Sequence, residues 1–153
     1  MHNLIHLTKT AQWRIFFAED DLDECALFQE MLKKNGVQTT PVFCHDGEAA
    51  LDYLRTCELL PDLVFLDINI PRINGLGVLT AMVRDSRLAS LPVVVFSTSN
   101  SPLSVQQAYA LGAGLYAYKP ASPATYKALI GKILGRAING LPPHKPMSEF
   151  IIG

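Results

Sequence analysis

Leu63-Val64-Phe65-Leu66-Asp67 joins four consecutive apolar residues to a single carboxylate, and this run is the strongest indication of the architecture. A second uninterrupted apolar run, Val93-Val94-Val95-Phe96, ends on Ser97. Continuous apolar runs of this length are typical of strands that are buried on both faces of a parallel sheet. The sequence therefore predicts a sheet covered by helices on both sides, with Asp67 and Ser97 at the points where two strands end.

Two further apolar runs also end on charged residues. Arg14-Ile15-Phe16-Phe17-Ala18 leads into Glu19 and Asp20, and Leu115-Tyr116-Ala117-Tyr118 leads into Lys119. The carboxyl ends of parallel strands lie at one edge of an open α/β sheet, and ligands bind at that edge. An acidic pair, a lone carboxylate, a hydroxyl and a lysine gathered there would form a cation site beside an acceptor for a phosphoryl group.

The chain alternates between strand and helix patterns five times. The short links between these patterns predict right-handed crossovers and a doubly wound sheet. Pro41 lies inside the second expected strand, which indicates an edge position. We expect strands at about residues 13–17, 38–43, 63–67, 93–97 and 115–119, and helices at about 22–34, 49–55, 75–84, 102–111 and 123–137.

The composition excludes several classes of protein. The 153 residues, 49% of them hydrophobic, fit one domain with a sizeable core. A net charge of −1 argues against a nucleic-acid partner held by phosphate neutralisation. No apolar run reaches the roughly 20 residues that a membrane helix needs. The three cysteines have no metal-like spacing and indicate free thiols, so we expect a cytoplasmic protein with no membrane contact.

The expected domain covers residues 12–138, with an N-terminal extension at 1–11 and a C-terminal extension at 139–153. The second extension is too short to build a core, so we expect no separate output domain. Its prolines favour extended backbone in the first half. The apolar cluster Phe150-Ile151-Ile152 could dock on the domain or on a partner, and fraying is the plainer alternative.

The carboxylates Glu19, Asp20 and Asp67 would repel one another if the fold brought them together. A hard divalent cation relieves that repulsion, and Mg²⁺ suits a site that supplies a few oxygens and leaves room for water. We expect Asp20 and Asp67 to bind the cation directly, whereas the longer Glu19 acts through water.

These residues occur in the order and spacing of a known family. Glu19-Asp20 follows the first strand, Asp67 lies in Leu-Asp-Ile-Asn-Ile-Pro-Arg-Ile-Asn-Gly, Ser97 lies five residues past Pro92, and Lys119 precedes Pro120. Over residues 12–138 the chain resembles the receiver domain of two-component response regulators, in particular the stand-alone receivers that resemble chemotaxis regulators. The resemblance implies a flavodoxin-like, three-layer α/β fold with five parallel strands in the order 2-1-3-4-5 and five helices.

The resemblance also implies a mechanism. Asp67 would accept a phosphoryl group from a histidine kinase or a histidine phosphotransfer protein, which is covalent catalysis by a carboxylate. Lys119 and Mg²⁺ would neutralise charge on the transferring group, and the backbone carbonyl of Asn69 would be a further metal ligand. Ser97 would hydrogen-bond the phosphoryl group, and Tyr116 would turn inward as the switch aromatic.

The family also suggests how the signal leaves the domain. The face formed by the fourth helix, the fifth strand and the fifth helix would change on phosphorylation, for an unknown output protein, for onward phosphotransfer or for a homodimer. The Lys119–Pro120 peptide bond would be cis. On this interpretation the protein is not an enzyme, and it catalyses only its own phosphorylation and slow dephosphorylation.

Each assignment has a plainer alternative. Glu19, Asp20 and Asp21 could all serve the N-terminus of the first helix, and we expect Asp21 to be mainly such a cap. Ser97 could cap a turn, because hydroxyl residues surround it. Tyr116 could be an ordinary core residue, although we prefer the switch role.

Two other functions compete with the signalling switch. Phosphatases of the haloacid-dehalogenase type use a similar set of groups, but their nucleophile follows the first strand and an aspartate two residues later acts as acid and base. Here the nucleophile follows the third strand and Asn69 occupies that later position, so turnover lacks a proton-transfer group. A pseudo-receiver, which has the fold without phosphorylation, is disfavoured because the required residues are present.

Overall fold

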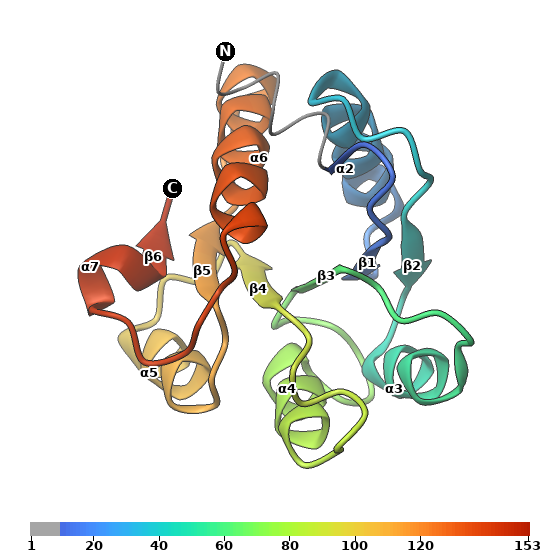
Figure 1. Cartoon of the computed structure of the whole chain (residues 1–153). Coiled ribbons are helices and arrows are strands. Elements are labelled where there is room, and N and C mark those ends of the chain that lie inside the picture. The colour runs from blue at the N-terminus through green and yellow to red at the C-terminus, as the bar shows by residue number, and fades with distance from the viewer. Residues whose placement is uncertain (1–9) are drawn as a thin grey trace.

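The computed structural model describes residues 10–153, which form three layers with a parallel sheet between two layers of helices (Figure 1). Helices α2 and α6 cover one face of the sheet, and α3, α4 and α5 cover the other. The strands lie in the order β2 (Val42–Cys44), β1 (Ile15–Ala18), β3 (Leu63–Leu66), β4 (Val93–Ser97), β5 (Leu115–Tyr118) and β6 (Ile151–Ile152). The helices are α2 (Leu22–Lys34), α3 (Gly47–Thr56), α4 (Gly75–Val83), α5 (Pro102–Ala110), α6 (Pro123–Ile138) and α7 (Met147–Phe150).

The predicted doubly wound, flavodoxin-like fold is confirmed, with the order 2-1-3-4-5 for the first five strands. All the strand pairings are parallel. The second strand is shorter than the predicted 38–43, because it begins only after Pro41, which has no N–H to give to a ladder. Its predicted edge position is confirmed. Within residues 10–153, no helix has the length and apolar character needed to cross a membrane.

Side chains fix the starts of the helices that follow the strands. The Asp21 carboxylate accepts hydrogen bonds from the backbone N–H groups of Asp23 and Glu24, at 2.9 and 3.2 Å. Asp46 accepts from the N–H of Ala49 at 2.7 Å. Such caps satisfy donors that a helix leaves unpaired at its N-terminus. The predicted capping role of Asp21 is confirmed, and α2 therefore begins directly beside the acidic pair.

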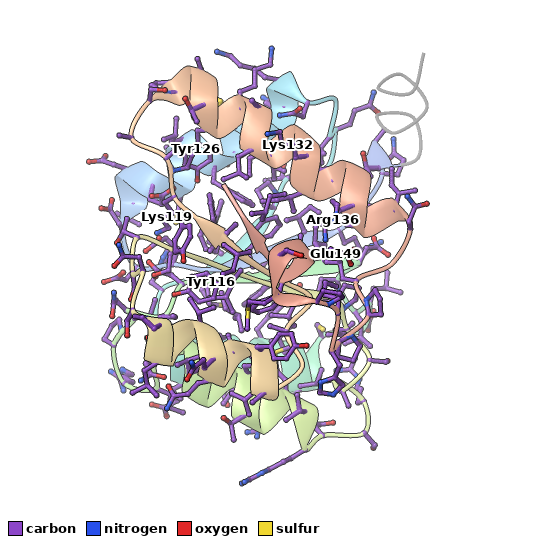
Figure 2. The ribbon with its side chains drawn as sticks, turned by 90° about the vertical axis from the view of Figure 1, so that its left-hand side faces the viewer. Tyr116, Lys119, Tyr126, Lys132, Arg136 and Glu149 are labelled. Atoms are coloured by element: carbon purple, nitrogen blue, oxygen red, sulfur yellow. The ribbon has the colours of Figure 1, made fainter. Side chains whose placement is uncertain are left out.

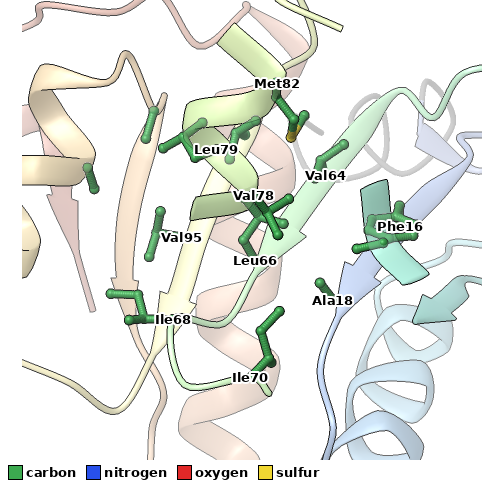
Figure 3. Packing of buried hydrophobic residues seen from close by; sticks show 14 of the residues in the cluster. Phe16, Ala18, Val64, Leu66, Ile68, Ile70, Val78, Leu79, Met82 and Val95 are labelled. Carbon is green, nitrogen blue, oxygen red and sulfur yellow. The ribbon is translucent and has the colours of Figure 1, made fainter. Parts of the chain in front are cut away.

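Two hydrophobic clusters hold the sheet between its helices. In β1 the side chains alternate, so that Phe16 and Ala18 belong to the cluster on the side of α3, α4 and α5, and Phe17 belongs to the other. Figure 3 shows the first cluster, in which residues of α4 pack on β3 and β4. The second cluster is rich in phenylalanine, with Phe28 4.6 Å from Phe17 and 4.8 Å from Phe65 between ring centroids. Aromatic pairs at such spacings contribute about 0.5–1.5 kcal/mol beyond the burial of their area.

Two glycines allow the loop after β3 to pack closely. A Cβ atom at Gly47 would lie 1.8 Å from the carbonyl oxygen of Ile73, and one at Gly75 would lie 2.2 Å from the carbonyl oxygen of Asp67. Both neighbours are backbone atoms, which cannot move aside as a flexible side chain can. These glycines therefore let the backbone of Asp67 lie against the start of α4, and that of Ile73 against the start of α3.

The expectation of five strands and five helices is wrong at the C-terminus, where the chain adds α7 and β6. The backbone of β6 pairs with β5, with Ile151 opposite Tyr116 and Ile152 opposite Ala117. Phe150 is fully buried and joins the first hydrophobic cluster. The C-terminal segment, defined as residues 139–153, thus docks on the domain, and the alternative of fraying is wrong for its last residues. The predicted N-terminal extension lies outside the described residues, apart from Thr10 and Ala11.

Candidate functional site

The strand ends converge as the sequence predicts. The N–H of Asp67 donates to the carbonyl of Ala18 at 3.1 Å, which ties the end of β3 to the end of β1. The N–H of Lys119 donates to the carbonyl of Ser97 at 3.0 Å, which ties β5 to β4 in the same way. Four segments that are far apart in the sequence therefore place their polar residues at one edge of the sheet.

Lys119 lies between two buried carboxylates. Its ammonium nitrogen is 2.8 Å from Oδ2 of Asp67 and also donates to Oε1 of Glu19. The three side chains are 7%, 10% and 2% exposed, so water screens these charges little. The ammonium also lies 5.7 Å from the centroid of the Phe17 ring and 5.9 Å from that of Phe96. The rings form an apolar floor whose faces attract a cation.

This arrangement sets the charges of the site. Burial alone would lower the pKa of Lys119, but its hydrogen bonds to Asp67 and Glu19 outweigh burial and raise that pKa. Burial would raise the pKa of Asp67, but the bond from Lys119 prevails and lowers it. At Glu19 burial prevails and raises the pKa from 4.5 to about 7. At neutral pH the site therefore holds an ammonium beside an ionised Asp67.

The residues expected to bind a cation supply suitable oxygen donors. Asp20 is exposed beside the buried Glu19, and the exposed Asn69 donates its N–H to Oδ1 of Asp67 at 3.3 Å. Carboxylate and carbonyl oxygens are the ligands that Mg²⁺ prefers. In residues 10–153, however, no three His, Cys, Asp or Glu side chains converge as a ready metal site. Lys119 occupies the place between the carboxylates, so a cation would have to share them with it.

The expected switch residues lie on the neighbouring strands β4 and β5, and both contact the loop that follows β4. Ser97 is fully buried, and its Oγ accepts a hydrogen bond from the N–H of Ser99 at 3.2 Å. Tyr116 is also fully buried, and its hydroxyl donates to the carbonyl of Ser99 at 2.8 Å. The structure therefore links Ser97 and Tyr116 through the backbone of a single residue. Tyr116 already points inward.

Three residues near the site were not predicted. Glu24 lies 3.5 Å from the Lys119 ammonium, and the hydroxyl of Tyr126 donates to Glu24. The ring nitrogen Nδ1 of His45 lies 2.8 Å from the carbonyl oxygen of Glu19. Of the three, only Glu24 could have been found from the sequence, because it lies in the first turn of the helix that follows the acidic pair.

The Lys119–Pro120 bond was expected to be cis, and this expectation is wrong. No peptide bond in residues 10–153 is cis. Lys119 reaches the carboxylates from the end of β5 with a trans bond after it.

A comparison with known protein families gives the site a context. The response regulator receiver domain matches residues 15–131, a range that includes Glu19, Asp20, Asp67, Ser97 and Lys119.

The chain belongs to the response regulator receiver domain family.

Relatives of this receiver include proteins of similar length. The probable methanogenesis regulatory protein FilR2 of Methanothrix harundinacea is 34% identical over 123 residues, which cover 78% of this chain and 79% of that protein. The response regulator Rcp1 of Synechocystis is 31% identical over 110 residues, which cover 69% of this chain and 75% of Rcp1.

Solved structures agree with this assignment. The phosphorylated cyanobacterial phytochrome response regulator RcpA has a TM-score of 0.78 and 30% identity, covering 88% of this chain and all of RcpA. The Mn²⁺-bound form of Rcp1 has a TM-score of 0.76 and 25% identity, covering 87% of this chain and 99% of Rcp1. The receiver described here is thus homologous to stand-alone response regulators.

The raised pKa of Glu19 predicts how stability varies with pH in the metal-free receiver. Between the unfolded value of 4.5 and the folded value of about 7, the folded state holds more protons than the unfolded state. The stability that Glu19 contributes is therefore complete below 4.5 and is lost as pH rises through about 7. Denaturation in chelator from about pH 5 to pH 8 should show the native protein losing stability relative to Glu19→Gln. Parallel pH profiles for the two proteins would contradict the prediction.

Proposed function

We propose that this chain is a response regulator that accepts a phosphoryl group on Asp67 from a histidine kinase or a histidine phosphotransfer protein. The proposal rests on the hydrogen bond between the Lys119 ammonium and the buried Asp67 carboxylate at the carboxyl edge of the sheet. A lowered pKa keeps Asp67 ionised, as a nucleophile must be. The lysine beside it supplies positive charge where the transferring group would carry negative charge.

A divalent cation is part of the proposed chemistry. Asp20, Asp67 and the backbone carbonyl of Asn69 would hold Mg²⁺, with Glu19 acting through water, and the cation would neutralise charge on the phosphoryl group. These four residues fit Mg²⁺ because they offer oxygen donors at the carboxyl edge of the sheet. It is supported by the homologue Rcp1, which has been solved with Mn²⁺ bound.

The chain's own groups have separate roles in the transfer. An oxygen of Asp67 would attack phosphorus while the donor nitrogen leaves with the electron pair of the broken P–N bond, and Lys119 would stay beside the Asp67 carboxylate. The Ser97 hydroxyl is placed to donate to a phosphoryl oxygen. Its oxygen also accepts the N–H of Ser99, so a shift of this side chain toward the phosphoryl group would pull on the loop after β4.

Signal output would follow from this movement of the loop after β4. The same Ser99 carbonyl accepts from Tyr116, so movement of the loop after β4 changes the support of the switch aromatic. The affected face consists of α5, β5 and α6, to which the C-terminal segment adds α7 and β6. We propose that this face binds an output protein, serves onward phosphotransfer or pairs with a second copy.

The proposed protein is a signalling switch and not a turnover enzyme. Position 69 carries an amide, which cannot act as a general acid or base, so hydrolysis of the acyl phosphate would be slow. The cysteines Cys25, Cys44 and Cys57 are free thiols, which suits the reducing cytoplasm in which we place the protein.

Phosphorylation should require both Asp67 and a divalent cation. After incubation with acetyl phosphate and Mg²⁺, intact-mass spectrometry should show the gain of one phosphoryl group in the native protein. Asp67→Asn should abolish the gain because an amide is not a nucleophile here, and chelator should do the same. The matched control Asp52→Asn removes an exposed carboxylate on α3 and should leave the gain unchanged. A gain that survives Asp67→Asn would contradict the assignment of the acceptor.

A further inference from the structure

A third carboxylate reaches Lys119 from the helix layer. Oε1 of Glu24, in the first turn of α2, lies 3.5 Å from the lysine nitrogen, and its side chain is 18% exposed. The other oxygen of the same carboxylate accepts a hydrogen bond from the hydroxyl of Tyr126, on α6. Tyr126 is 1% exposed, and its ring packs edge-on against Phe96 at 5.4 Å. Figure 2 shows Tyr126 lying close to Lys119 at the carboxyl edge of the sheet.

Glu24 differs from the other two partners of Lys119. Glu19 and Asp67 are also the carboxylates that a bound cation would attract, and Asp67 would carry the phosphoryl group. A bound cation would share both carboxylates with the ammonium and would weaken their attraction for it. Glu24 is expected neither to bind the cation nor to carry the phosphoryl group. The Tyr126 hydroxyl holds its carboxylate through the other oxygen, Oε2. Its attraction for Lys119 therefore persists when the other two weaken.

We propose that Glu24, held by Tyr126, is a positioning residue that keeps the Lys119 ammonium directed at Asp67 while a cation is bound. The inference rests on the proposed function and adds two residues to the phosphoryl-transfer site. Glu24 acts through Lys119 and touches neither the cation nor the phosphoryl group.

The test separates the rate of phosphorylation from the affinity for the cation. Glu24→Gln removes the charge and keeps the shape, whereas Tyr126→Phe keeps the charge and releases its far oxygen. At saturating Mg²⁺, Glu24→Gln should slow phosphorylation by acetyl phosphate about tenfold and Tyr126→Phe by less, because the first change removes the charge that attracts Lys119 and the second only releases it. The dissociation constant for Mg²⁺, from calorimetry, should change by a smaller factor than the rate in either variant, because Glu24 is not among the expected ligands of the cation.

The matched control is Asp23→Asn, which removes an exposed acid from the same turn of α2. This variant should be phosphorylated at the native rate. Equal rates for Glu24→Gln and Asp23→Asn would overturn the positioning role and leave the proposed function intact. A native protein that gains no phosphoryl group would instead overturn the proposed function, and the positioning role with it.

A separate observation concerns the C-terminal segment. Phe150 is fully buried, with its ring centroid 5.1 Å from that of Tyr109 and 6.4 Å from that of Tyr116. Tyr109 donates its hydroxyl to the carbonyl of Lys145 at 2.5 Å, and Arg136 donates to the carbonyl of Glu149 at 2.5 Å. Figure 2 shows Arg136 on α6 beside Glu149 on α7. Side chains from two helices thus fasten this segment along β5.

The docked segment meets the switch aromatic directly. Tyr116 points inward, with its hydroxyl on the Ser99 carbonyl, and Ile151 pairs with its backbone. Its ring also packs against Phe150, so an outward turn of Tyr116 would disturb the Phe150 contact. Two elements that share a contact bias each other's equilibrium equally, because coupling free energies are reciprocal.

We infer that docking of Phe150 and phosphorylation of Asp67 favour each other through the inward position of Tyr116. The inference rests on the proposed function and names the C-terminal segment as an element that responds to it. Phosphorylation would tighten the segment on β5, and loss of the segment would weaken the phosphorylated form.

Beryllofluoride, which mimics the phosphoryl group, provides the probe. Phe150→Ala should weaken beryllofluoride binding in Mg²⁺ about fivefold, a typical coupling between sites. The control Met147→Ala, in the same helix but 39% exposed, should bind as the native protein does. Hydrogen exchange at Ile151 and Ile152 should slow when beryllofluoride binds to the native protein. In Phe150→Ala, faster exchange at these two amides would prove that the segment is released. A native affinity for beryllofluoride in that released variant would overturn the coupling.

Discussion

The rest of the site depends on the ammonium of Lys119, which lies between the buried carboxylates of Glu19 and Asp67. Two carboxylates at this depth repel each other, and without a cation one of them would have to stay protonated. The lysine removes much of that cost at Asp67, whose pKa is lowered, but it cannot do so fully at Glu19, whose pKa is raised to about 7. Lys119 therefore balances the negative charge of the two carboxylates only in part, and a divalent cation would balance the rest.

The fold serves this ion cluster by fixing its members on separate rigid elements. Each comes from a strand end or from the first turn of a helix, and hydrogen bonds between neighbouring strand ends hold them in register. Gly75 lets the backbone of Asp67 lie against α4, and the rings of Phe17 and Phe96 form the floor beneath Lys119. The chemistry of the edge is thus built on packing, because no member of the cluster can shift without disturbing a buried neighbour.

Much of this was predictable from the sequence, since buried parallel strands read as continuous apolar runs and their ends share one edge. Asp67, Ser97 and Lys119 were located in this way, and the structure brings Asp67 and Lys119 into contact. The two-residue strand β6 escaped prediction because it is too short for a periodic signal and exists through the burial of Phe150. Glu24 and Tyr126 escaped for a related reason. They are 102 residues apart in the chain, and only the packing of α2 against α6 joins them.

One measurement tests whether Lys119 and a divalent cation serve the same carboxylates. The free energy of unfolding of the native protein and of Lys119→Met should be compared across a Mg²⁺ titration, with the fold verified by circular dichroism. A ligand that binds only the folded state stabilises it by an amount that grows with the logarithm of its concentration relative to its dissociation constant. If Lys119 and the cation do serve the same carboxylates, Lys119→Met should be the less stable protein without Mg²⁺ and should gain more stability than the native protein as Mg²⁺ is added. A loss of stability that stays the same at every Mg²⁺ concentration would contradict it.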